Sequence, residues 1–221
     1  MKREIILTGD GSSSVEIPAM KVTYHSRHGA IAESMHVFIN TGLKYLNEQE
    51  CSIFEMGFGT GLNALLTLME TEKLKRKITY TAVEQFPLEQ EIVHQLNYCD
   101  QFPGRENIFL QLHSSEWEKA IPLTPFFTLK KLNISLLNFL HAQSFNLVYY
   151  DAFAPNAQPE LWTTTIFEKL YQMLLPNGLL VTYCSKGDVQ RAMKAAGFKV
   201  EKLAGPAGKR EMVRAGRIDN E

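Results

Sequence analysis

The chain of 221 residues carries a formal net charge of −1 and 45% hydrophobic residues, which suits one α/β domain with a modest extension. No apolar run approaches the roughly 20 residues needed to span a bilayer, and the N-terminus lacks a signal-peptide core, so we expect a soluble, cytoplasmic protein without a membrane partner. The three cysteines are far apart and the six histidines show no ligand spacing, which disfavours a disulfide framework and a metal site.

The first 50 residues predict short strands and turns, with an early turn at residues 9–14 and a later strand at residues 35–39. We interpret residues 1–50 as a small N-terminal β extension that packs on a core domain of residues 51–221.

From residue 51 onward, short apolar runs alternate with helical patterns. The predicted strands lie at residues 52–56, 78–83, 108–112, 146–150, 179–184, 198–203 and 211–214. The predicted helices lie at residues 61–71, 87–98, 159–175 and 188–196. Residues 126–129 and 133–137 favour the strands of an inserted hairpin, and a helix there is the alternative. This order implies a Rossmann-like α/β fold, with a mostly parallel seven-stranded sheet and helices on both faces.

Three glycines, Gly57, Gly59 and Gly61, join the first core strand to the first core helix at a spacing of two residues. Glycine lets a ligand approach the backbone closely, near the positive end of the following helix. The spacing differs from the Gly-x-Gly-x-x-Gly of dinucleotide-binding enzymes, and no Lys-Ser/Thr pair marks a P-loop. With Glu55 two residues before it, the turn resembles motif I of class I S-adenosylmethionine-dependent methyltransferases. A glycine-rich turn without a ligand is the alternative.

Ligands of an open parallel sheet bind beyond the carboxyl ends of its strands, where the strand order reverses. Glu84 ends the second core strand, and its carboxylate is suited to accept hydrogen bonds from both hydroxyls of a ribose. After the predicted third strand, His113 and Ser114 are candidates for contacts with an adenine ring, although a lone histidine there is more often structural. An exposed strand-end acid without a ligand is the alternative for Glu84.

The fourth core strand ends in Asp-Ala-Phe-Ala-Pro at residues 151–155. This string resembles motif IV of methyltransferases that alkylate amine nitrogens, in which the acid faces the reacting nitrogen. Asp151 is therefore the candidate catalytic residue, and a strand-ending turn is the alternative interpretation of the string.

The motifs at residues 55–63, 83–88, 151–155, 161–163 and 208–212 occur in the order seen in one family. The chain resembles the MnmC-type methyltransferase domain, called MnmD when it stands alone, from about residue 33 to residue 214. The resemblance implies a class I methyltransferase fold and methyl transfer from S-adenosylmethionine to 5-aminomethyl-2-thiouridine at the tRNA wobble position, giving 5-methylaminomethyl-2-thiouridine. Relatives often carry a flavin-dependent oxidase domain, but this sequence has no second dinucleotide fingerprint, so we expect no FAD.

The implied cofactor-binding residues belong to the glycine turn and to the strand ends around it. They are Glu55, Gly57, Phe58, Gly59, Thr60, Gly61, Asn63, Glu84, Gln85, His113, Ser114 and Asp151.

Positive charge is concentrated near the C-terminus, because residues 186–217 hold nine Lys or Arg against three acids, whereas residues 1–185 hold 14 against 19. Such a cluster predicts contact with a polyanion, here the tRNA anticodon stem-loop, or a solvated face. The candidate phosphate ligands are Lys186, Arg191, Lys209, Arg210 and Arg214. Phe153, Pro155 and Trp162 could form the slot of a flipped base or could belong to the core.

Two other functions compete with this one. The chain could be a class I methyltransferase that acts on a small-molecule amine, or a non-catalytic protein that binds S-adenosylmethionine or RNA. An acid at the proposed reaction centre, Asp151, argues against the second of these.

Overall fold

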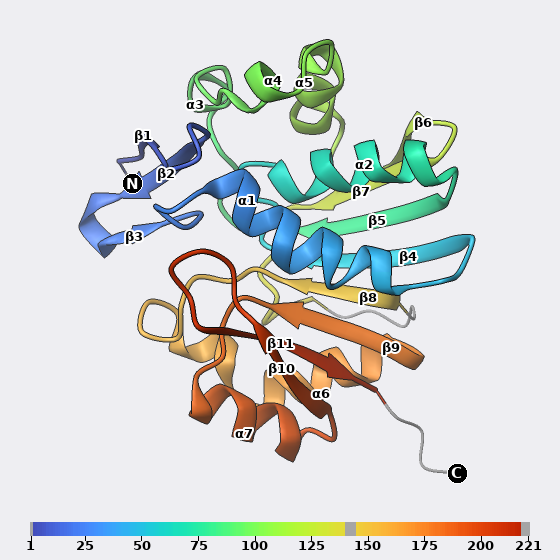
Figure 1. Ribbon diagram of the computed structural model, residues 1–221. Helices are drawn as coiled ribbons and strands as arrows, with labels where there is room; N and C mark the ends of the chain where they lie inside the picture. The colour runs from blue at the N-terminus through green and yellow to red at the C-terminus, as the bar shows by residue number, and fades with distance from the viewer. Residues whose placement is uncertain (1, 140–144, 218–221) are drawn as a thin grey trace.

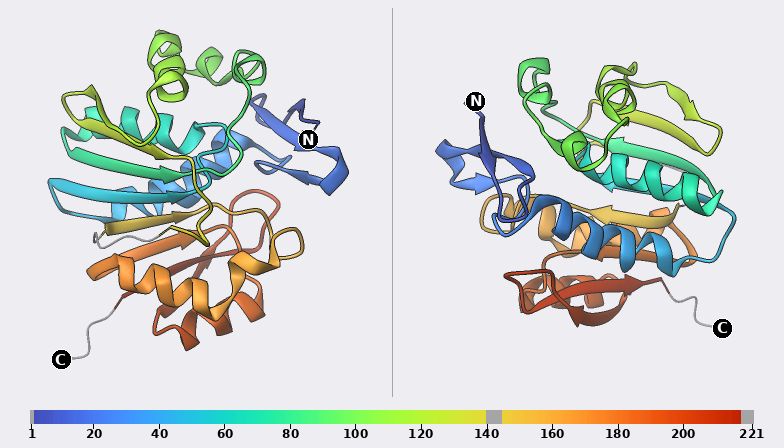
Figure 2. Two further views of the ribbon diagram at one scale, coloured as in Figure 1. Left: turned by 180° about the vertical axis from the view of Figure 1, so that it is seen from behind. Right: turned by 45° about the horizontal axis from the view of Figure 1, so that its top comes forward.

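The computed structural model describes residues 2–139 and 145–217, and its described strands form two sheets (Figure 1). The smaller sheet is antiparallel and contains β1 (Glu4–Leu7), β2 (Ser13–Ile17) and β3 (Val22–Thr23). It lies at one end of the molecule, beside the carboxyl ends of β4, β5 and β8 (Figures 1 and 2). The predicted N-terminal β structure is therefore confirmed for residues 4–23.

The large sheet of the described chain has eight strands in the order β10-β11-β9-β8-β4-β5-β7-β6. Their bounds are β4 Glu50–Met56, β5 Lys77–Val83, β6 Ala120–Thr124, β7 Phe127–Leu132, β8 Phe145–Tyr150, β9 Leu174–Thr182, β10 Lys199–Ala204 and β11 Glu211–Gly216. The five central strands from β7 to β9 are parallel, whereas β6 and β11 run antiparallel to their neighbours. The mostly parallel sheet is confirmed, with one strand more than the predicted seven. The chain order reverses between β4 and β8, which makes their carboxyl ends the switch point of the sheet.

Helices cover both faces of the large sheet, as predicted (Figure 2). On one face lie α1 (Ala30–Ser34), its continuation η2 (Met35–Asn40), η3 (Leu43–Tyr45), α2 (Leu62–Leu74) and α5 (Glu106–Ser114), followed at the sheet edge by α3 (Gln90–Val93) and α4 (Tyr98–Gln101). On the other face lie η4 (Pro159–Trp162), α6 (Thr164–Met173) and α7 (Gly187–Ala195). None of these described helices is long and apolar enough to cross a bilayer.

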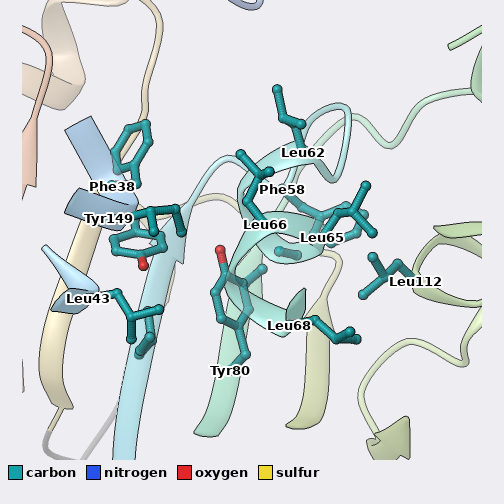
Figure 3. Packing of buried hydrophobic residues seen from close by; sticks show 14 of the residues in the cluster. Phe38, Leu43, Phe58, Leu62, Leu65, Leu66, Leu68, Tyr80, Leu112 and Tyr149 are labelled. Carbon is teal, nitrogen blue, oxygen red and sulfur yellow. The ribbon is translucent and has the colours of Figure 1, made fainter. Parts of the chain in front are cut away.

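Alternate residues of the central strands fill the two cores. Tyr149 of β8 packs with Phe38 and Leu43 on the α2 face (Figure 3), whereas Val148 and Tyr150 pack on the α6 face. Successive side chains of a strand point to opposite faces, so a strand covered on both sides carries apolar residues toward both faces. This explains why the predicted strands at residues 52–56, 78–83 and 146–150 are confirmed.

Three predicted strands are wrong, and two of these segments are helical. Residues 35–39 lie in η2, and residues 108–112 lie in α5. In α5 the buried residues Phe109, Leu112 and His113 follow the spacing of a helix face. Short apolar runs cannot be assigned to strand or buried helix by periodicity alone, and here tertiary packing decided.

The third strand of the parallel sheet is instead β7, which corresponds to the first strand of the predicted hairpin, at residues 126–129. Residues 133–137, expected to continue that hairpin, form the loop after β7. The predicted helix at 87–98 is replaced by the short helices α3 and α4, and the one at 159–175 is divided into η4 and α6. The predicted helices at 61–71 and 188–196 and the closing strands β10 and β11 are confirmed.

Candidate active site

A cavity of about 540 Å³ lies at the carboxyl ends of β4, β5, β7 and β8, where the strand order reverses. Its volume is that of a small-molecule site. The walls come from the glycine turn, from residues 84–87, from the loop after β7, from residues 151–153 and from the N-terminal sheet and the segment that follows it. The last group contributes Arg3, Ile17, Met20, Tyr24 and His25. The N-terminal residues are therefore part of the site.

The glycine turn needs glycine for its backbone conformation. Gly57, Gly59 and Gly61 have φ angles of +87°, +50° and +71°, a region that other residues rarely adopt. A β-carbon on Gly61 would lie 2.8 Å from Nε2 of His113, so space is lacking as well. The turn leads directly into α2, whose first residues Leu62 and Asn63 line the cavity.

Two histidines hold Thr60 in the middle of this turn. His25 Nε2 lies 2.7 Å from the Thr60 hydroxyl oxygen, and His113 Nε2 donates to the Thr60 carbonyl oxygen at 3.0 Å. Burial lowers the pKa of both imidazoles to about 4, so both are neutral at pH 7. His113 thus supports the turn from behind and does not line the cavity.

The predicted adenine contacts are not where the sequence suggested. His113 and the exposed Ser114 end helix α5, outside the cavity lining, because the strand from which they were inferred is a helix. The loop after the true third strand supplies Ile134, Ser135 and Leu137 instead. The pairing of β7 with β5 is what shows that this loop belongs to the site. In the sequence, the signal for it was the apolar run that precedes the loop.

Glu84 follows β5 and lines the cavity beside the glycine turn. Its carboxylate accepts hydrogen bonds from the backbone N–H of Gly59 at 3.0 Å and of Phe86 at 2.8 Å. Asn133 donates to the Glu84 carbonyl oxygen at 2.9 Å and so joins the loops after β5 and β7. Two of the exposed large apolar side chains, Phe86 and Leu137, are part of the cavity wall.

Asp151 follows β8 on the opposite side of the switch point. Its backbone N–H donates to the Met56 carbonyl oxygen at 3.2 Å, and its Oδ2 accepts from the Asn63 amide at 2.9 Å. Burial raises the pKa of this carboxyl to about 7, and the negative charge of Glu33 acts in the same direction, against the hydrogen bond from Asn63 and the positive charge of Lys209. Asp151 can therefore gain or lose a proton near neutral pH.

Most of the predicted cofactor residues meet in the cavity. The residues that line it are Gly57, Phe58, Gly59, Thr60, Asn63, Glu84, Gln85 and Asp151. Glu55 does not, because its side chain is fully buried behind Asn63, and Gly61 faces His113.

The three residues predicted to form the slot of a flipped base, Phe153, Pro155 and Trp162, have different surroundings. Phe153 lines the cavity and meets the Tyr24 ring edge-to-face, with ring centroids 5.1 Å apart. Trp162 is a buried core residue that packs on Tyr150 and donates its indole N–H to the Phe153 carbonyl oxygen at 2.8 Å. Pro155 is half-buried outside the lining of the cavity. Of the three predicted slot residues, only Phe153 lines the cavity, where its ring meets that of Tyr24.

Two of the basic candidates already have acidic partners inside the chain. Lys209 Nζ lies 2.5 Å from Glu33 Oε1, and Arg214 lies 2.7 Å from Glu201 Oε2. Lys186 is exposed and donates to Asn156 at 2.8 Å.

Arg191 and Arg210 are exposed, and neither has an ion-pair partner among the described side chains. Of the five predicted phosphate ligands, Lys186, Arg191 and Arg210 therefore have no acidic partner among the described side chains.

Comparison with known proteins identifies a methyltransferase family. Residues 77–218 match the model of a family described as S-adenosyl-L-methionine-dependent methyltransferase. The chain is 29% identical over 231 residues to the tRNA 5-methylaminomethyl-2-thiouridine biosynthesis bifunctional protein MnmC of Cupriavidus metallidurans, covering 95% of this chain and 33% of that protein. The MnmC protein of Burkholderia mallei is 31% identical, with 95% and 34% covered. The chain thus spans about a third of the length of these curated relatives.

Solved structures share the fold. MNMC2 from Aquifex aeolicus superposes with a TM-score of 0.81 at 24% identity, covering 99% of this chain and 71% of that one. Spermidine synthase from Thermotoga maritima superposes with a TM-score of 0.58 at 12% identity, covering 98% and 70%. At these identities the likeness concerns the fold alone.

Proposed function

The chain belongs to this family of S-adenosyl-L-methionine-dependent methyltransferases, and from that premise we propose that it methylates the aminomethyl nitrogen of 5-aminomethyl-2-thiouridine at the tRNA wobble position. The observation that carries the proposal is Asp151, which lines the cavity opposite the glycine turn with a pKa of about 7. The names of the MnmC relatives support the substrate. Acting on tRNA, the protein would work in the cytoplasm.

The residues of the cavity fit S-adenosylmethionine. Gly57 and Gly59 leave the backbone of the turn open to the cavity, and the N-terminus of α2 follows directly. A carboxylate has about four acceptor sites, so Glu84 can keep its two backbone hydrogen bonds and still accept the ribose hydroxyls. Phe86 and Leu137 offer apolar surface to the base. When bound there, the cofactor supplies an electrophilic methyl group.

The chain's own chemistry concerns the proton and the charge of the amine. An alkylamine with a pKa near 10.4 is protonated at pH 7, and exposing its lone pair costs roughly 4 to 5 kcal/mol. Asp151 can accept that proton and pass it to solvent, and its carboxylate can then stabilise the positive charge that develops on nitrogen as the new bond to carbon forms. Holding the amine in line with the methyl carbon is worth about 7 to 11 kcal/mol in favourable cases. Phe153 and Tyr24 would hold the base.

The tRNA would lie along the carboxyl ends of the parallel strands, where the cavity opens. Lys186 follows the carboxyl end of β9, and Arg210 precedes β11, which runs antiparallel to β9 and therefore starts at that end. Arg191 lies in the second turn of α7. These three exposed cations are the proposed ligands of anticodon-stem phosphates.

Transfer of a labelled methyl group tests the proposal. Purified protein with methyl-labelled S-adenosylmethionine should convert 5-aminomethyl-2-thiouridine in tRNA to the 5-methylaminomethyl nucleoside, detected by mass spectrometry after digestion. Transfer to a free alkylamine but not to tRNA would favour a small-molecule methyltransferase. Cofactor binding without transfer to either acceptor would favour a non-catalytic binding protein.

A further inference from the structure

Glu55 is an acid in the core behind the reaction centre. It lies near the end of β4, between Phe54 and Met56, and its side chain has no exposed surface. Because Phe54 packs on the α6 face, Glu55 points to the α2 face, toward the first turn of α2. The polar side chains around it there are those of Asn63 and Tyr80, and the nearest charge is that of Asp151.

Four buried polar atoms without hydrogen bonds collect at this point. Among the described side chains, both carboxyl oxygens of Glu55, Oδ1 of Asn63 and the hydroxyl of Tyr80 lack a partner. Figure 3 shows the Tyr80 hydroxyl directed toward the end of the sheet at which α2 begins. Buried polar atoms are rarely left unpaired in folded proteins, so these four are expected to pair with one another.

With the Asn63 amide oriented so that its Nδ2 donates to Asp151, the donors and acceptors match only if Glu55 carries a proton. Asn63 uses its Nδ2 on Asp151, which leaves the acceptor Oδ1 for Glu55, and an ionised carboxylate has no hydrogen to donate to it. The charged groups that act on Glu55 are the acids Asp151 and Glu84, so no positive charge compensates an ionised form. An uncompensated buried carboxylate is strongly unfavourable.

We propose that Glu55 is a neutral positioning residue, whose carboxylic acid accepts from the Tyr80 hydroxyl, donates to Asn63 Oδ1, and thereby directs the Asn63 N–H to Asp151. The hydrogen-bond chain stands on the structure alone, whereas its effect on turnover rests on the proposed function. Each bond in such a chain polarises the next. Asp151 is thus held toward the cavity by a donor that cannot rotate away.

The direction of the pKa shifts agrees with this chain. Burial raises the pKa of Glu55 well above its ordinary value and the charge of Asp151 acts in the same direction, which together outweigh the opposite effect of the Asn63 and Tyr80 side chains. The hydrogen bond from Asn63 opposes the burial that raises the pKa of Asp151. Loss of an ordered Asn63 should therefore raise the pKa of Asp151 further.

Two substitutions of Glu55 test the proposal kinetically. Glu55→Leu should lower kcat about tenfold or more and move the acid limb of the pH profile to higher pH, with an affinity for S-adenosylmethionine within a few-fold of the wild type. Glu55→Gln keeps one donor and one acceptor and should restore kcat and the acid limb. If Glu55 is ionised, as it would be with the Asn63 amide reversed, Glu55→Gln removes a negative charge and moves the limb to lower pH, which overturns the proposal.

Asn63→Ala provides a second route, and it should reproduce the loss of kcat and the shift of the acid limb. Because both residues act through one chain, the double variant Glu55→Leu/Asn63→Ala should lose little more than either single variant. Additive losses would overturn the chain.

An infrared measurement needs neither tRNA nor turnover. In Asp151→Asn protein at pH 8, the C=O band of a protonated carboxylic acid should be present, and Glu55→Gln in the same background should remove it. Absence of the band would overturn the neutral state of Glu55. A wild-type protein that shows the band but does not methylate tRNA would refute the proposed function and leave the hydrogen-bond chain intact.

Discussion

Lys209 and Glu33, which are 176 positions apart in sequence, form an ion pair with 2.5 Å between Nζ and Oε1. The pair joins the loop before β11 to helix α1 beside the reaction centre, and both of its charges act on the pKa of Asp151. The Glu33 carboxylate also accepts a hydrogen bond from the backbone N–H of Ser26 at 2.7 Å. The ammonium group of Lys209 lies 3.8 Å from the centre of the Tyr183 ring. The electrostatic surroundings of Asp151 therefore depend on a contact between segments from opposite ends of the chain.

Removing one partner of this pair should be worse than removing both. The Glu33 side chain is only 8% exposed, so Lys209→Met leaves a nearly buried carboxylate without its cation. We expect a loss of about 2 to 4 kcal/mol in the free energy of unfolding, and a smaller loss for the double variant Lys209→Met/Glu33→Gln. Urea denaturation of the single and double variants at pH 7.5 measures the coupling. Strictly additive losses would show that the two residues do not stabilise one another.

Asp151→Asn should abolish most turnover and preserve cofactor binding. The amide cannot accept the proton of the substrate amine, and general bases contribute about 100-fold to 10,000-fold. We expect kcat to fall by at least 100-fold, with a dissociation constant for S-adenosylmethionine within a few-fold of the wild type, measured by calorimetry. In the wild type, kcat should fall about tenfold per pH unit below pH 7, where Asp151 becomes protonated. Near-normal turnover by the variant would remove Asp151 from the mechanism.

The same substitution should stabilise the fold above neutral pH. The pKa of Asp151 is about 7 in the folded protein and about 3.9 in an unfolded chain, so the folded state binds more protons between these values. Stability therefore decreases as the pH rises from about 4 to 7, and the loss is complete above the folded pKa. Asp151→Asn should raise the free energy of unfolding by on the order of 1 to 2 kcal/mol at pH 8, allowing for solvent screening, and by less at pH 4. Equal effects at both pH values would contradict the raised pKa.

Gly61→Ala should damage the cofactor turn more than its backbone angle alone explains. Gly61 has a φ of +71° and lacks room for a β-carbon beside His113. Gly104 is a matched control, because its φ is +81° and, apart from its chain neighbours, no atom lies within 4 Å of the place that a β-carbon would occupy. Gly104→Ala should cost about 1 to 2 kcal/mol in thermal unfolding, whereas Gly61→Ala should cost more and weaken cofactor binding. Equal losses of stability in the two variants would show that the turn can accommodate the added methyl group.

The response of tRNA binding to salt distinguishes free from paired arginines. Arg210 is exposed without an ion pair in the described structure, whereas Arg214 pairs with Glu201 and stacks on Tyr45. Arg210→Ala should reduce the slope of log affinity against log salt by about one, and Arg214→Ala should leave the slope unchanged. A wild-type affinity that does not vary with salt would refute phosphate binding altogether.

Local patterns were sufficient where the chemistry lies close together in sequence. The glycine spacing predicted the turn and the start of α2, and the acids after two apolar runs predicted Glu84 and Asp151 at the cavity. The N-terminal contribution of Tyr24 and Arg3 had no local signal, because their partners in the site lie on distant segments.

By itself, the sequence determined the alternating α/β order, the glycine turn and the acids that follow the central strands, because each depends on backbone conformation or burial within a few residues. Only the tertiary structure decided that residues 108–112 are a helix, that β7 is the third strand, and that Lys209 pairs with Glu33. These outcomes depend on which surfaces and charges meet across long sequence separations. An apolar run or a lysine does not specify its partner until the chain is folded.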